Sequence, residues 1–509
     1  MKRIIPILLG VTLCAGLFLR VWGIDFGLPY VYHPDEPRRV LIIQNMFKEG
    51  DLNPRFFNYP SLFLYINALA YIPYYLFGKL LGVFSTRHDI LPPISLAMGV
   101  TYSPMPTTIL LGRMITVIFG VGTILLNFLI GKRLTGKPVV GLLASLFIAV
   151  SPSNVSHSRF ITPDTFVVFF VAASFLATVL VYQEGKAWHY AAAGICAGLA
   201  ISSKYNGVWI LIPLVLAHFL RLGKAGFTDR KLVLALLVCG LSFIATTPFA
   251  LLDLRRFITD VRFAARHYST GHAGMEGSPF AWYVDSMGRT AGLIYLLAVL
   301  ECLRGILSRD RRIILLSSFP AVYFAFINGF AVRNDRTFLP LTPFLFLLAS
   351  CFLVWLINKA NGLRRKTCQI SALFAIALLL VGCLAQPISK TITNTARLTM
   401  VDSRETARVW LDENLPSGAK VALESYSPFV DPSRFFVQGF GRIIDHKPKW
   451  YIEQGFDYLI MSQGMYGRYY QDPQKYEDEV ARYEEFFARF HAVKVFTDGG
   501  YEIRVYQVR

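Results

Sequence analysis

The chain has 509 residues, of which 54% are hydrophobic, and it carries a formal net charge of +18 at pH 7. This hydrophobic fraction, gathered in long runs, excludes an ordinary soluble globular protein. The positive charge does not predict a nucleic-acid partner, because Lys and Arg stand in short clusters between the apolar runs, where membrane topology places them. All seven Cys lie in or beside apolar segments, so we interpret them as core residues, without a disulfide framework or a zinc site.

The N-terminal segment predicts the first membrane-spanning helix. Residues 1–22 begin like a signal peptide but lack a clear small-residue cleavage site, so we expect this helix to be retained. Later runs approach the roughly 20 apolar residues needed to cross a bilayer core, and they must be helical because hydrocarbon satisfies no free backbone group. We predict about eleven crossings, at residues 4–22, 108–131, 138–154, 164–183, 188–203, 206–220, 232–250, 289–307, 313–331, 338–357 and 369–386.

Basic clusters between the runs set the orientation, because Lys and Arg concentrate in cytoplasmic loops. We therefore place the clusters at residues 2–3, 132–137, 186, 221–231, 304–312 and 359–366 inside. The N-terminus is then cytoplasmic and the C-terminus extracytoplasmic, in a multi-pass protein of the cell membrane.

One further apolar run, residues 59–84, is long enough to span but would reverse this charge pattern. Its many aromatic side chains and Pro73 suit the membrane interface. We predict a juxtamembrane or re-entrant element within a first outer loop at residues 23–107, and an ordinary crossing remains the alternative.

Beyond residue 388 the sequence predicts a small soluble α/β domain, residues 389–509, after a transmembrane domain at residues 1–388. Asp402 and Glu405 form a capping-box-like helix start. Strands are predicted at 421–425 and 457–461, a helix over about 474–490, and a closing hairpin-like pair of strands. This domain shows no metal or nucleophile motif, and we expect it to cover the site or bind the acceptor.

The first polar cluster on the predicted outer side contains His33, Asp35 and Glu36. Carboxylates beside a membrane are costly unless they are solvated or paired, which favours a functional role. One of them could take a proton from an acceptor hydroxyl as a general base. The alternative is a solvated turn whose acids pair with Arg38 and Arg39, worth about 1 kcal/mol or less if exposed.

Two more clusters follow the third and fifth crossings. His157, Arg159 and Asp164 share the side of Asp35, although Asp164 could simply offset a helix dipole in a first turn. Lys204 stands in a short outer connection, against the positive-inside trend. An anionic partner or a snorkelling side chain would each explain it.

The last two clusters are the segment that opens the tenth crossing and the long loop before the eighth. Arg333 and Arg336 could grip phosphate oxygens, or pair with Asp335 and lipid headgroups. The loop from residue 253 to 289 is long and Gly-rich and fits a mobile lid, although an amphipathic surface helix explains its apolar spacing equally well. It contains His272, whose neighbours are too loosely spaced for a metal site.

With these residues placed, the chain resembles the GT-C superfamily of membrane glycosyltransferases, in the branch of protein O-mannosyltransferases and lipid A aminoarabinose transferases. The resemblance covers the whole membrane part. It rests on a set of motifs whose order along the chain and common side of the membrane make them fairly specific. They are the pair Asp35-Glu36, YPSL at 59–62, the Gly-Arg of LLGRM at 112–113, GKRLTG at 131–136, SRFITPD at 158–164, SKYNG and VRNDRTFLPLTP at 332–343, with WLDENLPSGAKV at 410–421 and DYLIM in the soluble domain.

This resemblance implies a GT-C fold, a polyprenyl-phosphate-linked sugar donor, an acceptor on the outer face and inversion at the anomeric carbon. Asp35 would be the base that deprotonates the acceptor, while Glu36 and Asp164 would shape or polarise the site. Lys204, Arg333 and Arg336 would neutralise the departing lipid phosphate, as preorganised cations do at a low-dielectric boundary. His33, His157, Arg159 and His272 are further candidates for lining the site.

Two departures from the family pattern matter. The second motif holds one acid, Asp164, where the oligosaccharyltransferase branch uses two with a divalent metal, so we expect no metal site and no obligatory cofactor. The glutamate-lysine pair of the aminoarabinose enzymes is not evident near residues 58–60, which argues against aminoarabinose and lipid A as substrates. The sugar stays open, and the acceptor stays open between protein, lipid and glycan.

The main alternative function is a multi-pass transporter or lipid flippase with an extracytoplasmic sensor domain. It would require ionisable groups at mid-membrane or inverted repeats, and the sequence shows neither. A noncatalytic scaffold is a weaker alternative, because it leaves the acidic and basic clusters on one side unexplained.

Overall fold

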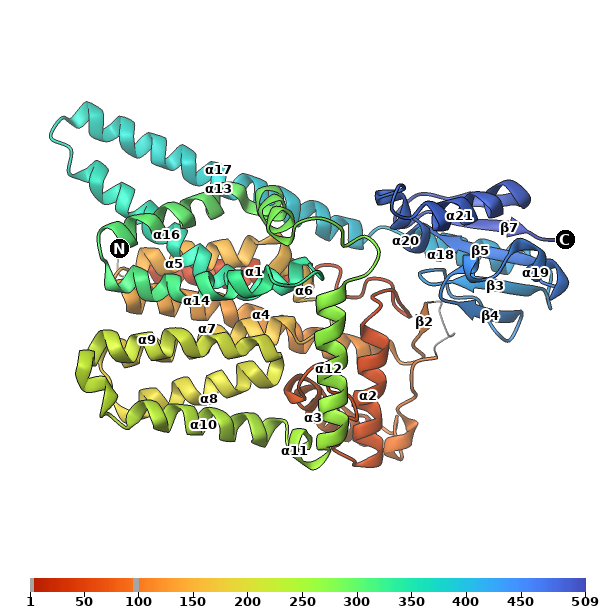
Figure 1. Cartoon of the computed structure of the whole chain (residues 1–509), viewed down its shortest axis with the longest axis horizontal. Helices are drawn as coiled ribbons and strands as arrows, with labels where there is room; N and C mark the ends of the chain where they lie inside the picture. Colours follow the sequence, from red (N-terminus) through yellow and green to blue (C-terminus); the bar gives the residue numbers. More distant parts are fainter. Residues whose placement is uncertain (1–3, 95–99) are drawn as a thin grey trace.

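The computed structural model describes residues 4–94 and 100–509. Helices of the membrane part lie side by side along one direction, and a small domain with a β-sheet stands beyond one end of the bundle (Figure 1). The bundle contains α1 (Ile4–Val21), α4 (Pro106–Thr135), α5 (Pro138–Val150), α7 (Asp164–Gln183), α8 (Ala187–Ser203), α9 (Leu211–Leu222), α10 (Lys231–Thr246), α13 (Pro279–Leu307), α14 (Arg311–Ile327), α16 (Thr342–Asn361) and α17 (Lys366–Leu398).

Each of the eleven predicted crossings overlaps one of these helices. Among the described residues, seven helical segments are long and apolar enough to span a membrane, and α5 and α10 are shorter apolar helices. The multi-pass membrane class is therefore confirmed, while the count of eleven crossings stays a prediction. The basic cluster at residues 2–3 lies outside the described residues.

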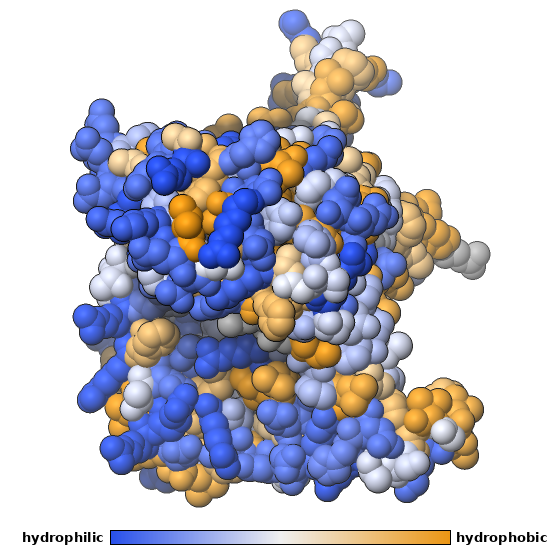
Figure 2. Space-filling model, turned by 90° about the vertical axis from the view of Figure 1, so that its right-hand side faces the viewer, coloured by the Kyte–Doolittle hydropathy of each residue, from blue (hydrophilic) through white to orange (hydrophobic). Residues whose placement is uncertain are grey.

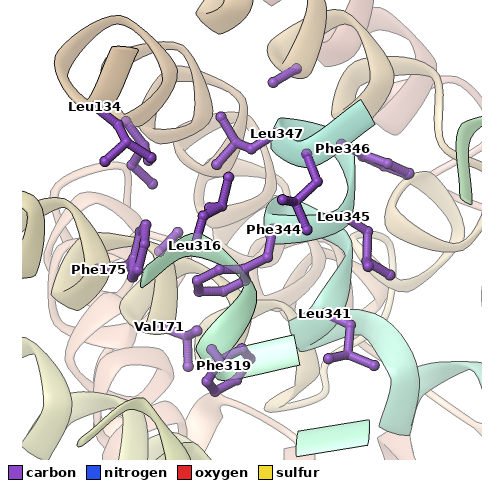
Figure 3. Packing of buried hydrophobic residues seen from close by; sticks show 14 of the residues in the cluster. Leu134, Val171, Phe175, Leu316, Phe319, Leu341, Phe344, Leu345, Phe346 and Leu347 are labelled. Carbon is purple, nitrogen blue, oxygen red and sulfur yellow. The ribbon is translucent and has the colours of Figure 1, made fainter. Parts of the chain in front are cut away.

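Most of the apolar span of α16 is buried inside the protein. This helix therefore lies in the middle of the bundle. Figure 3 shows Phe344 of α16 between side chains of α7 and α14. Its ring centroid lies 4.6 Å from that of Phe319 and 4.8 Å from that of Phe175. Small residues allow closer contacts elsewhere: a Cβ added at Gly141 of α5 would come within 2.2 Å of a carbonyl oxygen of α4, so the two backbones pack directly.

A second layer of helices covers the end of the bundle that faces the sheet domain. Helices α2 (Glu36–Glu49) and α12 (Leu254–Thr270) run across the bundle direction, and α3 (Leu62–Leu80) lies beside them and is seen nearly end-on in Figure 1. Helix α3 is not among the candidate spans found in the described residues, and the juxtamembrane element at residues 59–84 stays a prediction. Short elements complete the layer: β1 (Tyr30–Val31), β2 (Thr101–Tyr102), α6 (Pro152–His157), α11 (Phe249–Leu252) and α15 (Asp335–Phe338).

The segment from residue 253 to 289 is mostly helical, so the prediction of a long mobile loop is wrong. Its first half is α12, so the alternative of an amphipathic surface helix describes it better. Helix α13 begins at Pro279, well before the predicted crossing at 289. Only the short Gly-containing stretch at residues 271–278 is a loop.

The C-terminal part forms a five-stranded mixed sheet in the order β4-β3-β5-β7-β6, with helices packed on it. Strands β3, β4 and β5 are parallel, and β5, β7 and β6 are antiparallel. Its elements are α18 (Ser403–Asn414), β3 (Lys420–Glu424), β4 (Phe436–Phe440), α19 (Pro448–Glu453), β5 (Tyr458–Ser462), α20 (Gln463–Tyr466), α21 (Glu477–Arg489), β6 (His491–Phe496) and β7 (Ile503–Gln507). Helix α17 continues to Leu398, past the expected boundary at residue 389.

Figure 2 looks at the end of the molecule that carries this domain. The surface there is mostly hydrophilic, and hydrophobic residues gather mainly in patches and towards the margins. The two termini lie at opposite ends of the long axis (Figure 1).

Candidate active site

Asp35 immediately precedes α2, at the end of the bundle that faces the sheet domain. Its carboxylate is paired with Arg39, one helical turn later, at 3.3 Å, and with Arg336 of α15. Burial would raise the pKa of Asp35, but the two guanidinium groups outweigh it and hold the pKa at about 2. A third of the side chain remains exposed, so Asp35 is an ionised carboxylate that a small molecule can reach.

Glu36 has a different environment, although it is the next residue. Its side chain is fully buried and accepts two hydrogen bonds from Arg113 of α4, at 3.0 and 2.8 Å, and one from the backbone N–H of Ile161 at 3.0 Å. Arg113 also donates to the carbonyl oxygens of Ile24 and Phe26. Glu36 therefore joins three chain segments, and in this way it shapes the site and fixes the position of Asp35.

A second ion pair lies deeper. Lys204, directly after α8, donates to the carboxylate of Asp164, the first residue of α7, at 2.8 Å. Both side chains are buried. A buried ammonium and carboxylate must be paired to remain charged, so each of these residues keeps the other ionised at the membrane boundary.

Tyr59 connects the two ion pairs. The guanidinium of Arg39 lies 5.3 Å and the ammonium of Lys204 5.9 Å from the centroid of its ring. Burial raises the pKa of the Tyr59 phenol, so the hydroxyl is protonated. The ion pair of Asp35 with Arg39 and the pair of Asp164 with Lys204 thus lie on the same tyrosine, a residue that sequence reasoning did not assign.

Two of the three predicted histidines lie beside this cluster. The ring of His33 stacks on Phe160 at 4.2 Å, and His157 meets the same ring edge-on at 6.1 Å. Burial lowers the pKa of both imidazoles, to about 4 for His33. Both are therefore neutral near pH 7 and add no positive charge to the site.

Three predicted residues do not face the ion pairs. The buried Arg159 donates to Thr395 of α17 at 2.7 Å and to the carbonyl oxygens of α1, so it joins helices. Arg333 donates to the carbonyl oxygens of Glu276 and Gly277 and so fastens the loop at residues 271–278. His272 is part of this loop, where its ring stacks on that of His267.

Two cavities flank the ion pairs. A cavity of about 220 Å³ is lined by Lys204, Tyr59 and Thr337 on one side and by apolar side chains of α12 and α14 on the other. A larger one of about 440 Å³ lies between α2 and the sheet domain and is bordered by Pro34, Pro37 and Arg38, neighbours of Asp35 in the chain. The site therefore has a mainly apolar compartment at Lys204 and a second compartment beside the chain segment that contains Asp35.

The described part of the chain has no group of three or more His, Cys, Asp and Glu side chains that could hold a metal ion. The positive charge at the site comes from side chains, namely Lys204, Arg39 and Arg336.

Part of the chain is similar in sequence to a known protein family. The family model for dolichyl-phosphate-mannose-protein mannosyltransferase matches residues 95–258. Dolichyl-phosphate-mannose–protein mannosyltransferase 1 of Candida albicans is 26% identical over 138 residues, which is 25% of this chain. The match spans only 16% of the length of that relative.

Solved structures show the fold over almost the whole chain. ArnT from Cupriavidus metallidurans in the apo state superposes with a TM-score of 0.56 at 14% identity, covering 99% of this chain and 98% of that one. The oligosaccharyltransferase of Archaeoglobus fulgidus in the apo form gives a TM-score of 0.57 at 13% identity and covers 92% of this chain and 70% of that one. The expected fold is therefore confirmed by these two structures. Nothing in these matches supports a transporter.

Proposed function

We propose that this protein is an inverting glycosyltransferase that moves a sugar from a polyprenyl-phosphate-linked donor to an acceptor at the outer face of the membrane, with Asp35 as the general base. One observation carries the proposal: the accessible, ionised carboxylate of Asp35 pairs with Arg336 at the hydrophilic end of the bundle, near the buried Asp164–Lys204 pair. The match to a mannosyltransferase family and the shared fold support it.

The donor is assigned to the cavity at Lys204. Its apolar wall suits a prenyl chain, while the ammonium of Lys204 and the nearby guanidinium of Arg336 suit a phosphate. Negative charge grows on the phosphate as the sugar leaves, and cations already in place stabilise that charge. A structure of ArnT, which has the same fold, is described as bound to undecaprenyl phosphate, which favours this class of donor.

The acceptor is assigned to the compartment at Asp35, between α2 and the sheet domain. Asp35 takes the hydroxyl proton as the acceptor oxygen attacks the anomeric carbon, and the lipid phosphate leaves towards Lys204. Attack and departure on opposite sides invert that carbon. A donor phosphate that draws Arg336 towards itself also leaves Asp35 with one cation fewer, which makes the carboxylate a stronger base.

Arg333 is not assigned to the phosphate, because its guanidinium fastens the loop at residues 271–278. Since Lys204 and Arg336 supply the positive charge, no divalent metal or other cofactor is needed, and transfer should continue in a metal chelator. The end with the sheet domain is assigned to the outer side and the N-terminus to the cytoplasm, in agreement with the basic clusters.

The test is sugar transfer from a radiolabelled polyprenyl-phosphate donor in membranes that contain Asp35→Asn. We expect transfer to fall by at least about 100-fold, the usual contribution of a general base, with normal protein abundance. Asp51→Asn is a matched control, because Asp51 forms an exposed pair with Arg55 after the end of α2. Transfer that persists in the Asp35 variant would remove this residue as the base.

A further inference from the structure

Helix α12 carries a stripe of arginines on its outer side. Arg255, Arg262 and Arg266 are exposed, and their spacing of seven and four residues places them on one side of the helix. Within the described residues, none of the three forms an ion pair, whereas Arg256 pairs with Asp260 at 3.0 Å. Three positive charges in a row thus remain uncompensated on this surface.

Apolar side chains stand next to the stripe. Leu254 and Ile258, one turn apart, are 49% and 38% exposed, and Leu251 and Leu252 just before the helix are 58% and 75% exposed. The apolar helix α10 ends at Thr246, a few residues earlier, and α12 runs across the end of the bundle (Figure 1). Helix α12 therefore lies where a bilayer surface would meet the protein, with the composition of an interfacial amphipathic helix.

The inner side of α12 is already occupied by the protein. Val261, Ala264 and Tyr268 line the cavity of about 220 Å³, and Asp260 accepts a hydrogen bond from the backbone N–H of Phe57 at 2.8 Å. Contacts of the outer side with its surroundings would therefore hold one wall of that cavity in place.

We propose that the outer side of α12 docks on anionic phospholipid headgroups of the surrounding leaflet. The exposed leucines and isoleucine enter the boundary of the acyl chains, while the three guanidinium groups reach headgroup phosphates, as Arg does at membrane interfaces. A zwitterionic surface would satisfy the apolar side chains but leave the positive charge uncompensated, so the net charge of the lipid decides the contact.

The test is hydrogen–deuterium exchange of residues 254–270 in the full-length protein, reconstituted in nanodiscs of phosphatidylcholine alone or with added phosphatidylglycerol. We expect the amides of α12 to exchange more slowly with the anionic lipid, by about fivefold or more, the effect of one basic residue at such a surface. High salt should reduce this difference by screening. The difference should disappear in the variant Arg255→Gln, Arg262→Gln, Arg266→Gln and persist when the same residues are replaced by Lys.

A control variant removes the same charge from the sheet domain, through Arg482→Gln, Arg489→Gln and Lys494→Gln, which are all exposed. It should retain the full response of α12. Equal exchange in the two lipids, or an unchanged response in the Gln variant of α12, would overturn the proposal. The measurement needs no transferase activity, so its outcome is independent of the proposed function.

Discussion

Replacing Glu36 by Gln should destabilise the protein strongly. The carboxylate of Glu36 is fully buried and accepts three hydrogen bonds, two of them from Arg113. Glutamine removes the charge but keeps the size, so the guanidinium of Arg113 stays buried beside a neutral amide. Loss of one partner of a buried ion pair costs about 3–5 kcal/mol, and part of this is the desolvation of a charge that cannot move into water.

Asp35→Asn is the matched comparison, because it makes the same chemical change at the neighbouring residue. The partners Arg39 and Arg336 stay charged. The pair with Arg336 is partly open to solvent, and the buried Arg39 keeps its hydrogen bond to the carbonyl oxygen of Ile161. Such pairs contribute about 0–1 kcal/mol. We therefore expect Asn at position 35 to abolish transfer without a measurable loss of stability, and Gln at position 36 to lower the stability.

Thermal unfolding in detergent, followed by fluorescence, measures the stability of each variant. Sugar transfer from the lipid-linked donor measures its activity. The midpoint should fall by several degrees for Glu36→Gln and by less than about one degree for Asp35→Asn. A Glu36→Gln protein that unfolds at the parental temperature would refute the structural role given to the buried pair. A large loss of stability in Asp35→Asn would refute the reasoning from exposure.

Three further predictions concern charged groups. Arg336→Gln should raise the pKa of Asp35 from about 2 towards the ordinary value of about 3.9, so the acidic limb of the pH profile of kcat/KM should move to higher pH; an unmoved limb contradicts the pairing. Lys204→Met should destabilise the protein by about 3–5 kcal/mol, because it leaves the carboxylate of Asp164 buried and unpaired. Adding Asp164→Asn to this variant should restore the melting temperature but not sugar transfer. Burial raises the pKa of Glu424 in the sheet domain from 4.5 to about 7. Between pH 4.5 and pH 7 the folded state therefore binds more protons than the unfolded state. The contribution of Glu424 to stability is then largest below pH 4.5, and about 3 kcal/mol is lost as the pH rises through 7. Urea unfolding of that domain in the full chain at pH 5 and pH 8 should show this loss, and Glu424→Gln should remove the pH dependence.

Local patterns in the sequence predicted the helices and most strands, because each depends on neighbouring residues. Runs of apolar residues marked every helix of the bundle, and period-two patterns marked β3 and β5 close to their observed positions. Strand β4, at Phe436–Phe440, was missed. It lies at the edge of the sheet, and half-exposed side chains with an internal glycine give it little alternation to detect.

The site was predicted less completely, because its partners are far apart in the chain. The charge and sidedness of Asp35, Asp164 and Lys204 were visible in the sequence, and the structure brings them together. The partners of Glu36 and Arg333 were not visible: Arg113 lies 77 residues from Glu36, and Arg333 binds backbone carbonyls of a loop, which leave no sequence signal. Side chains with the same charge on the same side can therefore shape a site or hold a loop, and only long-range contacts distinguish these roles.

The long helix α17 sets the height of the sheet domain above the lipid. Its 33 residues extend about 50 Å at 1.5 Å per residue, more than the ~30 Å of a hydrocarbon core, and Figure 1 shows it running from the far end of the bundle towards that domain. Because α17 is continuous, a change of its tilt in the membrane moves the sheet domain at its end. A thicker bilayer would draw more of α17 into the lipid or change its tilt. The cavity between α2 and the sheet domain would then narrow or widen, so the size of acceptor that fits should depend on the thickness of the membrane.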